Sequence, residues 1–160
     1  MKYRSMEKDL LVLSYLRRDA RESLTRISKQ TNIPVSTIFD KIRYTKGRLI
    51  KKFTTIIDFQ SLGFYARVLI LIKAKKEERE SIREYMINHK HVNSALRINN
   101  NFDFLIEAIF KDIGELEQFN DELESKFNIE NRQTFFIIED VKREEFLSSP
   151  EYLQMVNFNL

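Results

Sequence analysis

The chain has 160 residues and a formal net charge of +3, with 42% hydrophobic residues, 32% charged residues and no cysteine. This length allows one domain or two small ones, and the lack of cysteine excludes disulfides, thiol catalysis and thiolate metal ligands. The sequence has no run of about 18 apolar residues, so it predicts no membrane helix. Its N-terminal MKYRSMEKDLL lacks the apolar segment of a secretory signal. We therefore expect a cytoplasmic protein with no membrane partner.

The small net charge conceals a division between the two parts of the chain. Residues 1–58 carry 14 Lys and Arg against 6 Asp and Glu, a net charge of +8, whereas residues 59–160 carry a net charge of −5. A basic segment joined to an acidic one is typical of a nucleic-acid-binding module attached to a regulatory module. Ordinary surface charge is the alternative explanation, and the helical pattern in the basic segment argues against it.

The basic segment contains helical periodicity followed by a strand-like run. Apolar spacing predicts helices at residues 7–18, 24–30 and 35–46, with a tight turn at 31–34. In the third helix, Val35, Ile38 and Ile42 mark the buried side. The run LIKKFTTII at residues 49–57 has the composition of a strand. This order predicts a winged helix-turn-helix, whose third helix enters the major groove of DNA.

The polar side of the third predicted helix carries candidate DNA contacts. Ser36, Asp40 and Arg43 project away from the buried side, and Thr37 and Tyr44 flank them. The hydroxyls of Ser36 and Thr37 lie at the helix N-terminus, where they can cap the helix, contact phosphates or base edges, or do both. The candidate phosphate contacts are the nearby basic residues Lys41, Lys46, Arg48, Lys51 and Lys52.

Asp40 has two readings on this helix. Its carboxylate can accept a hydrogen bond from a cytosine amino group, which would give a base preference. It can also pair with Arg43 one turn along the helix. The ion pair is the favoured reading, because a carboxylate close to phosphates is usually costly.

From Tyr65 onward the pattern predicts an α+β unit with the order βαββαβ. The predicted strands are residues 65–75, 91–98, 102–110 and 132–142, and the predicted helices are residues 77–88 and 113–127. This order is that of a ferredoxin-like fold. Helices on one face of a four-stranded sheet leave the other face open, and Phe-rich strands make a second copy of the chain its natural cover. We therefore expect a homodimer.

Four segments follow from these patterns. They are a winged helix-turn-helix at residues 1–58, a connector at 59–64, a βαββαβ dimerisation and effector domain at 65–145, and a helical extension at 146–160. In the extension, Ser149 and Pro150 resemble the start of a helix. The extension is expected either to pack on its own subunit or to clasp a neighbouring one.

The sequence contains little that predicts catalysis. It has three glycines and none of the glycine-rich or nucleophile motifs of common enzymes. His89 and His91 are the only histidines, and without further spaced ligands they read as surface turn residues rather than a metal site. We expect no enzyme activity, no cofactor and no metal.

Part of this sequence resembles a known family. IPVSTIFDKIR and LIKKFTTIIDFQSLGF are similar to the DNA-binding half of the Lrp/AsnC (feast/famine) transcription regulators. The positions that match the family pattern are Ser36, Thr37, Ile42, Leu49, Ile50, Phe53, Ile57, Asp58, Leu62 and Gly63. The predicted βαββαβ order also matches the family's second (RAM or ACT-like) domain. The resemblance implies a sequence-specific regulator that binds double-stranded DNA as a homodimer or an octamer and responds to a small effector such as an amino acid.

The resemblance also implies an effector site at the turn Asn99, Asn100, Asn101, Phe102 and Asp103. The family usually has G-x-Y-D there, and this chain has Asn100 in place of the glycine. Asparagine tolerates left-handed backbone geometry, so we expect the turn to form. Its side chain can obstruct the approach of an effector to the backbone.

Two alternative functions differ in class from a sequence-specific regulator. One is an effector-sensing or architectural protein with weak or nonspecific DNA binding, which Asp40 favours and the net charge of residues 1–58 opposes. The other is an enzyme, since siroheme decarboxylases are similar to Lrp/AsnC proteins in architecture. Those enzymes tend to carry R-R-F-G-A and W-P-Y-N stretches, whereas this chain has KKFTT at residues 51–55 and no tryptophan.

Overall fold

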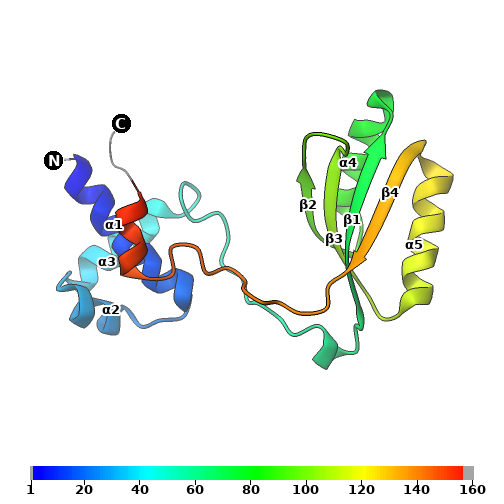
Figure 1. The fold of residues 1–160 in the computed structure, drawn as a ribbon. Helices are drawn as coiled ribbons and strands as arrows, with labels where there is room; N and C mark the ends of the chain where they lie inside the picture. Colours follow the sequence, from blue (N-terminus) through cyan, green and yellow to red (C-terminus); the bar gives the residue numbers. More distant parts are fainter. Residues whose placement is uncertain (1, 157–160) are drawn as a thin grey trace. The chain divides into compact units, whose positions relative to one another are not determined.

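The computed structural model describes residues 2–156, and its chain folds into two compact units (Figure 1). Unit 1 comprises Met1–Ile56 and Val141–Leu160, and unit 2 comprises Ile57–Asp140. Unit 2 is therefore inserted into unit 1, because the chain leaves unit 1 after Ile56 and returns to it at Val141.

Unit 1 begins with three helices, drawn from blue to cyan in Figure 1: α1 (Lys2–Arg18), α2 (Leu24–Thr31) and α3 (Val35–Thr45). α1 starts earlier than the helix predicted at residues 7–18. α2 begins after Ser23, whose Oγ accepts a hydrogen bond from the Arg26 N–H (3.2 Å). It ends at Asn32, which adopts a left-handed backbone conformation (φ 55°). The tight turn predicted between the second and third helices is thus confirmed.

The three helices enclose a small apolar core. Its buried members are Val12, Ile27, Ile33 and Ile38, with Ile42 and several residues of α1 packed against them. Val35 differs from the prediction, because its side chain is 42% exposed. It is the first residue of α3 and lies at the edge of this core, so only Ile38 and Ile42 of the predicted stripe face inward.

A buried ion pair joins α1 to α3. Lys41 Nζ lies 2.5 Å from Asp9 Oδ1, and the two side chains are only 13% and 9% exposed. Lys41 was predicted to contact DNA phosphates, but its ammonium faces the interior of unit 1. Because its charge is held by Asp9, Lys41 is removed from the candidate DNA contacts.

The predicted wing strand is not formed. Lys46 and Ile50 make a single bridge around Gly47 (φ 81°), and residues 51–58 belong to no strand in the described chain. Strand geometry needs a neighbour that completes its hydrogen bonds. None of the described residues supplies such a neighbour, and Phe53, Ile56 and Ile57 remain about half exposed.

The end of the described chain packs on α1. Arg17 donates to the Glu144 carboxylate (2.8 Å) and to the backbone carbonyls of Glu144 (2.9 Å) and Phe146 (3.1 Å). A short 3-10 helix, η3 (Pro150–Met155), follows and contacts α1. The C-terminal segment therefore joins unit 1 from Val141, earlier than the boundary expected at residue 146. Residues 157–160 of the predicted extension lie outside the described residues.

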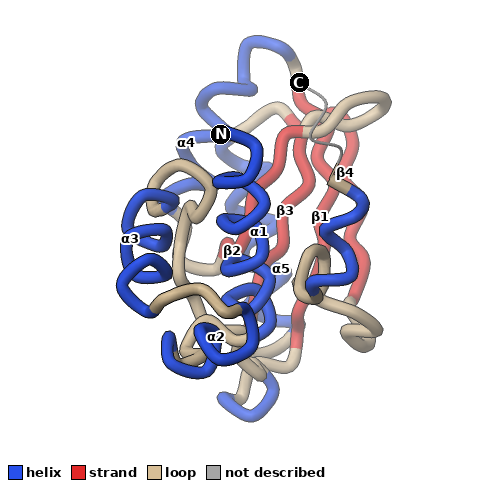
Figure 2. Tube along the Cα trace, turned by 90° about the vertical axis from the view of Figure 1, so that its left-hand side faces the viewer, coloured by secondary structure: helices blue, strands red, loops and turns tan. Residues whose placement is uncertain are grey.

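Unit 2 is a four-stranded antiparallel sheet with two long helices. Its elements are β1 (Ala66–Ala74), α4 (Arg79–Asn88), β2 (Val92–Arg97), β3 (Phe104–Phe110), α5 (Ile113–Lys126) and β4 (Ile129–Phe136). The strands lie in the order β2-β3-β1-β4 (Figure 2, red). This arrangement confirms the predicted βαββαβ order and the α+β class.

The two faces of the sheet differ. Ile70, Ile72 and Ile106 are fully buried against α4 and α5. Alternate residues of each strand point to the other face. The strand registers place Leu96, Leu105 and Leu71 in one row of that face, and Leu69 beside Phe135 in the next. Leu96 and Phe135 are more than half exposed, so this open face is apolar and only partly covered.

The ion pair between Asp9 and Lys41 leads to a first prediction. Lys41→Met leaves the Asp9 carboxylate buried without its lysine, which we expect to cost about 3 kcal/mol. Hydrogen exchange at the Ile27 and Ile38 amides, both in the core of unit 1, measures this loss. Asp9→Leu combined with Lys41→Met should recover most of it. Lys46→Met, on an exposed side chain, is the control, and equal losses in Lys41→Met and Lys46→Met would contradict the assignment.

Candidate functional site

The outward side of α3 presents a polar surface. Ser36, Asp40 and Arg43 are exposed, and Thr37 is half-buried. Tyr44 is 66% exposed, and the Arg48 guanidinium stacks over its ring at 5.1 Å from the centroid. Apart from Lys41, the residues of this helix that were predicted to contact DNA therefore lie on one side of it.

The N-terminus of α3 has no side-chain cap. The N-cap position is Pro34, which makes no side-chain hydrogen bond to the helix. The first backbone N–H groups of a helix lack partners within it, so they attract anions. Because capping does not occupy the hydroxyls of Ser36 and Thr37, they are available to a ligand at this helix end.

Asp40 and Arg43 do not form the ion pair favoured from the sequence. Among the described residues the structure contains no salt bridge or hydrogen bond between them, although they lie one turn apart on α3. Both side chains face solvent. The reading in which Asp40 accepts a hydrogen bond from a base therefore remains open.

Basic side chains follow α3 directly in the chain. Lys46, Arg48, Lys51 and Lys52 are all exposed. Lys51 Nζ donates to the Gly47 carbonyl (3.3 Å), which holds this lysine beside the turn after α3. These residues provide cationic groups next to the polar side of the helix.

Phe39 was missed by the sequence reasoning. It lies on α3 beside the polar surface, and its side chain is 55% exposed. The signal was present, because Phe39 is one residue, or about 100°, away from the buried Ile38. The sequence reasoning named Thr37 and Tyr44 as flanking residues and did not consider an aromatic ring on the other flank.

The predicted effector turn has the expected backbone. Asn100 adopts a left-handed conformation (φ 69°), as expected of an asparagine in place of glycine. Asn99, Asn100 and Asn101 are exposed, and Phe102 is half-buried. The amide side chains and the backbone of this turn are accessible to a ligand.

Asp103 has a structural role in this turn. Its carboxylate is buried and accepts a hydrogen bond from the Ala74 N–H (3.1 Å), and it forms ion pairs with Arg79 Nη2 (2.8 Å) and Lys73 Nζ (3.5 Å). Its own N–H donates to the Ile72 carbonyl (2.8 Å). The carboxylate therefore joins β1, α4 and the start of β3, and an effector must displace a cation to reach it.

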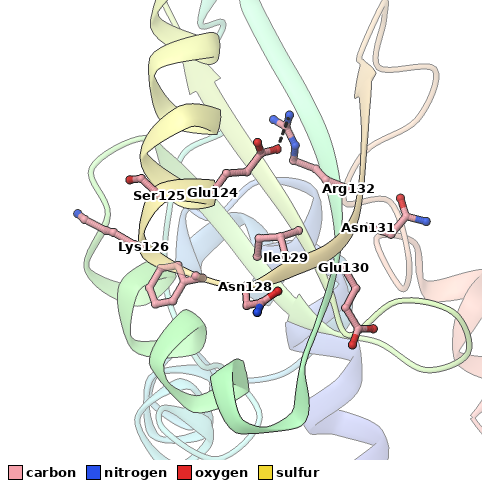
Figure 3. Close-up of a pocket in the computed structure, with 9 residues that line it drawn as sticks. Glu124, Ser125, Lys126, Asn128, Ile129, Glu130, Asn131 and Arg132 are labelled. Carbon is pink, nitrogen blue, oxygen red and sulfur yellow. Dashed lines mark ion pairs between the residues drawn. The ribbon is translucent and has the colours of Figure 1, made fainter.

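A cavity of about 720 Å³ lies at the same end of the sheet. The register pairs Ile72 with both Phe104 and Arg132, which places the effector turn and the α5–β4 turn at the same end of the sheet. Figure 3 shows Arg132 and Glu124 facing each other in this cavity, and their side chains are joined at 3.0 Å. The Arg132 Nη1 group is buried and has no hydrogen-bond partner. This guanidinium therefore has a donor group that its ion pair with Glu124 does not use.

The two histidines lie in the turn between α4 and β2, as predicted, but not fully at the surface. Both are half-buried, and their rings contact Phe119 (His89) and Phe110 (His91) at 4.8 Å between centroids. Burial lowers the pKa of His89, although Glu122 opposes this effect, so this histidine is neutral at pH 7. Within residues 2–156 no group of three or more His, Cys, Asp and Glu side chains is placed to hold a metal ion.

No helix among the described residues is both long enough and apolar enough to cross a bilayer.

Comparison with known proteins identifies the family. Residues 67–146, half of the chain, match the family described as the Lrp/AsnC ligand binding domain. The chain is 28% identical to HTH-type transcriptional regulator FL11 of Pyrococcus horikoshii, over 85% of this chain and 91% of that protein. It is also 28% identical to an uncharacterized HTH-type transcriptional regulator of Pyrococcus furiosus, over 89% of this chain and 96% of that protein.

Solved structures share the fold. AsnC of E. coli has a TM-score of 0.73 at 17% identity, over 84% of this chain and 93% of that one. A transcriptional regulator of Neisseria meningitidis in complex with L-Met has a TM-score of 0.77 at 18% identity, over 84% and 90%. The matched domain, the regulator relatives and the shared fold agree with the expectation drawn from the sequence motifs: the chain belongs to the Lrp/AsnC family of helix-turn-helix transcription regulators.

Proposed function

We propose that α3 enters the major groove of double-stranded DNA and that the basic residues after it contact the flanking phosphates. The observation that carries this proposal is the polar side of α3, where Ser36, Asp40 and Arg43 are exposed and the helix N-terminus is uncapped. The proposed base and phosphate contacts are Ser36, Thr37, Asp40, Arg43, Tyr44, Lys46, Arg48, Lys51 and Lys52.

Within this set, the residues have different tasks. The three lysines and the arginine after α3 supply affinity, because each neutralised phosphate releases counterions. Ser36 and Thr37 fix the position of the helix on the backbone or on base edges. Asp40 accepts a hydrogen bond from a cytosine amino group, which is consistent with its lack of an ion pair to Arg43.

We propose further that the protein is a homodimer formed through the open face of the sheet. A single four-stranded sheet with both helices on one side leaves its other side without a covering layer. The apolar residues Leu69, Leu71, Leu96 and Phe135 on that face support a second copy as the cover. A two-fold dimer presents two copies of α3 to a pseudo-palindromic DNA site. Assembly of dimers into octamers is an extension of the same proposal.

The effector is proposed to be an amino acid bound near Asn99–Asp103. The L-Met complex of the Neisseria meningitidis regulator supports a ligand of this class. In this chain the Asp103 carboxylate already has partners, so the backbone and amide groups of the turn remain to recognise the ligand. The Arg132 N–H that has no partner, at the same end of the sheet, is suited to a carboxylate.

The alternatives from the sequence make different predictions. An architectural protein would bind every duplex with equal affinity, and this binding would disappear at higher salt. The regulator names of the relatives favour a role without enzyme activity, and the proposed function has no catalytic step.

A regulator that contacts DNA works in the cytoplasm of a prokaryotic cell, which is the proposed location.

Fluorescence anisotropy on duplex DNA from the protein's own upstream region tests the proposed function. A shuffled duplex is the control, and both are measured at low and near-physiological salt. Tighter binding to the native duplex that persists at the higher salt is the expected result. Equal binding that disappears with salt would favour the architectural alternative, and no binding at either salt would refute the DNA-binding proposal.

The phosphate contacts give a second prediction. Lys51→Ala with Lys52→Ala should flatten the slope of log affinity against log salt by about one unit for each phosphate that the variant no longer neutralises. Lys75→Ala with Lys76→Ala, an equally exposed pair in unit 2, is the matched control and should keep the slope. An unchanged slope in the first variant would remove these lysines from the DNA interface.

The open face of the sheet gives a third prediction. Phe135→Glu places a charge on the proposed dimer contact, so the molar mass from light scattering should fall toward that of one chain at micromolar concentration. Ile87→Glu, on an α4 residue that is 61% exposed, should leave the mass unchanged. A dimer that survives Phe135→Glu and dissociates with Ile87→Glu would place the contact on the helical side.

The effector turn gives a fourth prediction. Asn100→Gly keeps the left-handed backbone and removes the side chain that hinders a ligand. We expect a larger rise in melting temperature with millimolar L-amino acids in this variant than in the original chain, because a ligand that binds the folded state stabilises it. Asn101→Gly, at the next exposed position, is the control. Equal rises in both variants would exclude Asn100 from the ligand path.

A further inference from the structure

Phe39 is an apolar ring on a helix surface that is otherwise polar. Its side chain is 55% exposed, and it is not part of the apolar core formed by Val12, Ile27, Ile33 and Ile38. Full burial of a phenylalanine removes a large apolar surface from water and stabilises a folded protein. At this position the folded unit does not gain that stabilisation, so Phe39 has another role or none.

The other large ring on α3 differs in its surroundings. Tyr44 is covered by the guanidinium of Arg48 at 5.1 Å. Within residues 2–156 no aromatic ring or cation packs on Phe39. Of these two aromatic residues, only Phe39 presents a ring without such a partner.

The position of Phe39 places it among the proposed base contacts. Residues three and four apart on a helix are surface neighbours, so Phe39 lies next to Ser36 on one side and Arg43 on the other. α3 advances about 10 Å from Ser36 to Arg43 at 1.5 Å per residue. This is the length of about three base pairs at 3.4 Å each. Phe39 therefore falls within the part of the groove that these two polar residues span.

The major groove offers one apolar group among the four standard base pairs, the C5-methyl of thymine, and phenylalanine is one of the side chains that contact it. We propose that Phe39 packs on a thymine methyl and specifies thymine at one position in each half-site. This inference rests on the proposed DNA binding of α3 and adds a defined base to the recognised sequence. The contact between the Phe39 ring and the methyl group requires no hydrogen bond.

In vitro selection from random duplexes with the full chain identifies the preferred site. Each thymine of that site is then replaced singly by deoxyuridine, which removes only the methyl group. One replacement per half-site should weaken binding roughly fourfold, the effect of losing one buried methyl. In Phe39→Ala the same replacement should weaken binding less than about twofold, because the ring that it contacts is gone. Tyr65→Ala, which removes a 72% exposed ring outside the proposed DNA contacts, is the control and should keep the full penalty.

Three results would overturn the inference. An identical deoxyuridine penalty in the original chain and in Phe39→Ala would show that another group contacts the methyl. A change in the particle mass of Phe39→Ala by light scattering would place the ring in a contact between protein copies. Selection without an enriched motif would refute the proposed sequence-specific binding and this inference with it, whereas the first two results leave that binding intact.

Discussion

The contact between Asp9 and Lys41 determines which side of α3 faces solvent. The core residues Ile38 and Ile42 fix one side of the helix inward, and the ion pair adds a charged anchor next to them. With Lys41 directed at α1, the helix can expose only the side that carries Ser36, Asp40 and Arg43. A rotation of α3 that turned Lys41 to solvent would leave Asp9 buried without its partner, so the electrostatic cost resists it. The surface proposed to read DNA therefore depends on an ion pair that lies on the opposite, interior side of the helix.

Unit 2 neutralises its buried carboxylates in a comparable way. Glu107 points to the open face of the sheet, where it accepts from Arg67 Nε (2.7 Å) and Asn93 Nδ2 (2.5 Å). Arg67 also reaches Asp140 at 2.7 Å. Burying an unpaired charge is expensive, whereas a paired and hydrogen-bonded one can be covered. This local neutralisation makes the face compatible with a covering second copy, and the position of the pair near the middle of the sheet would favour one register of the two copies.

Local patterns predicted the elements well and the environments of single residues less well. The periodicities of 3.6 and 2 residues gave the order of helices and strands, since each element's own apolar side determines them. The burial of Lys41 depends on Asp9, which is distant in sequence, and no local signal shows that contact. The wing was predicted from the β-branched composition of residues 49–57, but a strand also requires a neighbour, which composition does not supply. Phe39 was overlooked because attention fell on polar side chains, and an exposed ring is recognised only after the core is known.

The insertion of unit 2 into unit 1 has a consequence for synthesis on the ribosome. The residues that Arg17 holds, Glu144 and Phe146, are translated after all of unit 2. During elongation the sheet of unit 2 can therefore form before α1 contacts its C-terminal partner segment, since domains fold as units once their residues are available. A nascent chain would possess α1 to α3 and their apolar core before the segment that Arg17 holds. The helix-turn-helix therefore gains these last contacts on α1 only in chains that already contain the sheet of unit 2.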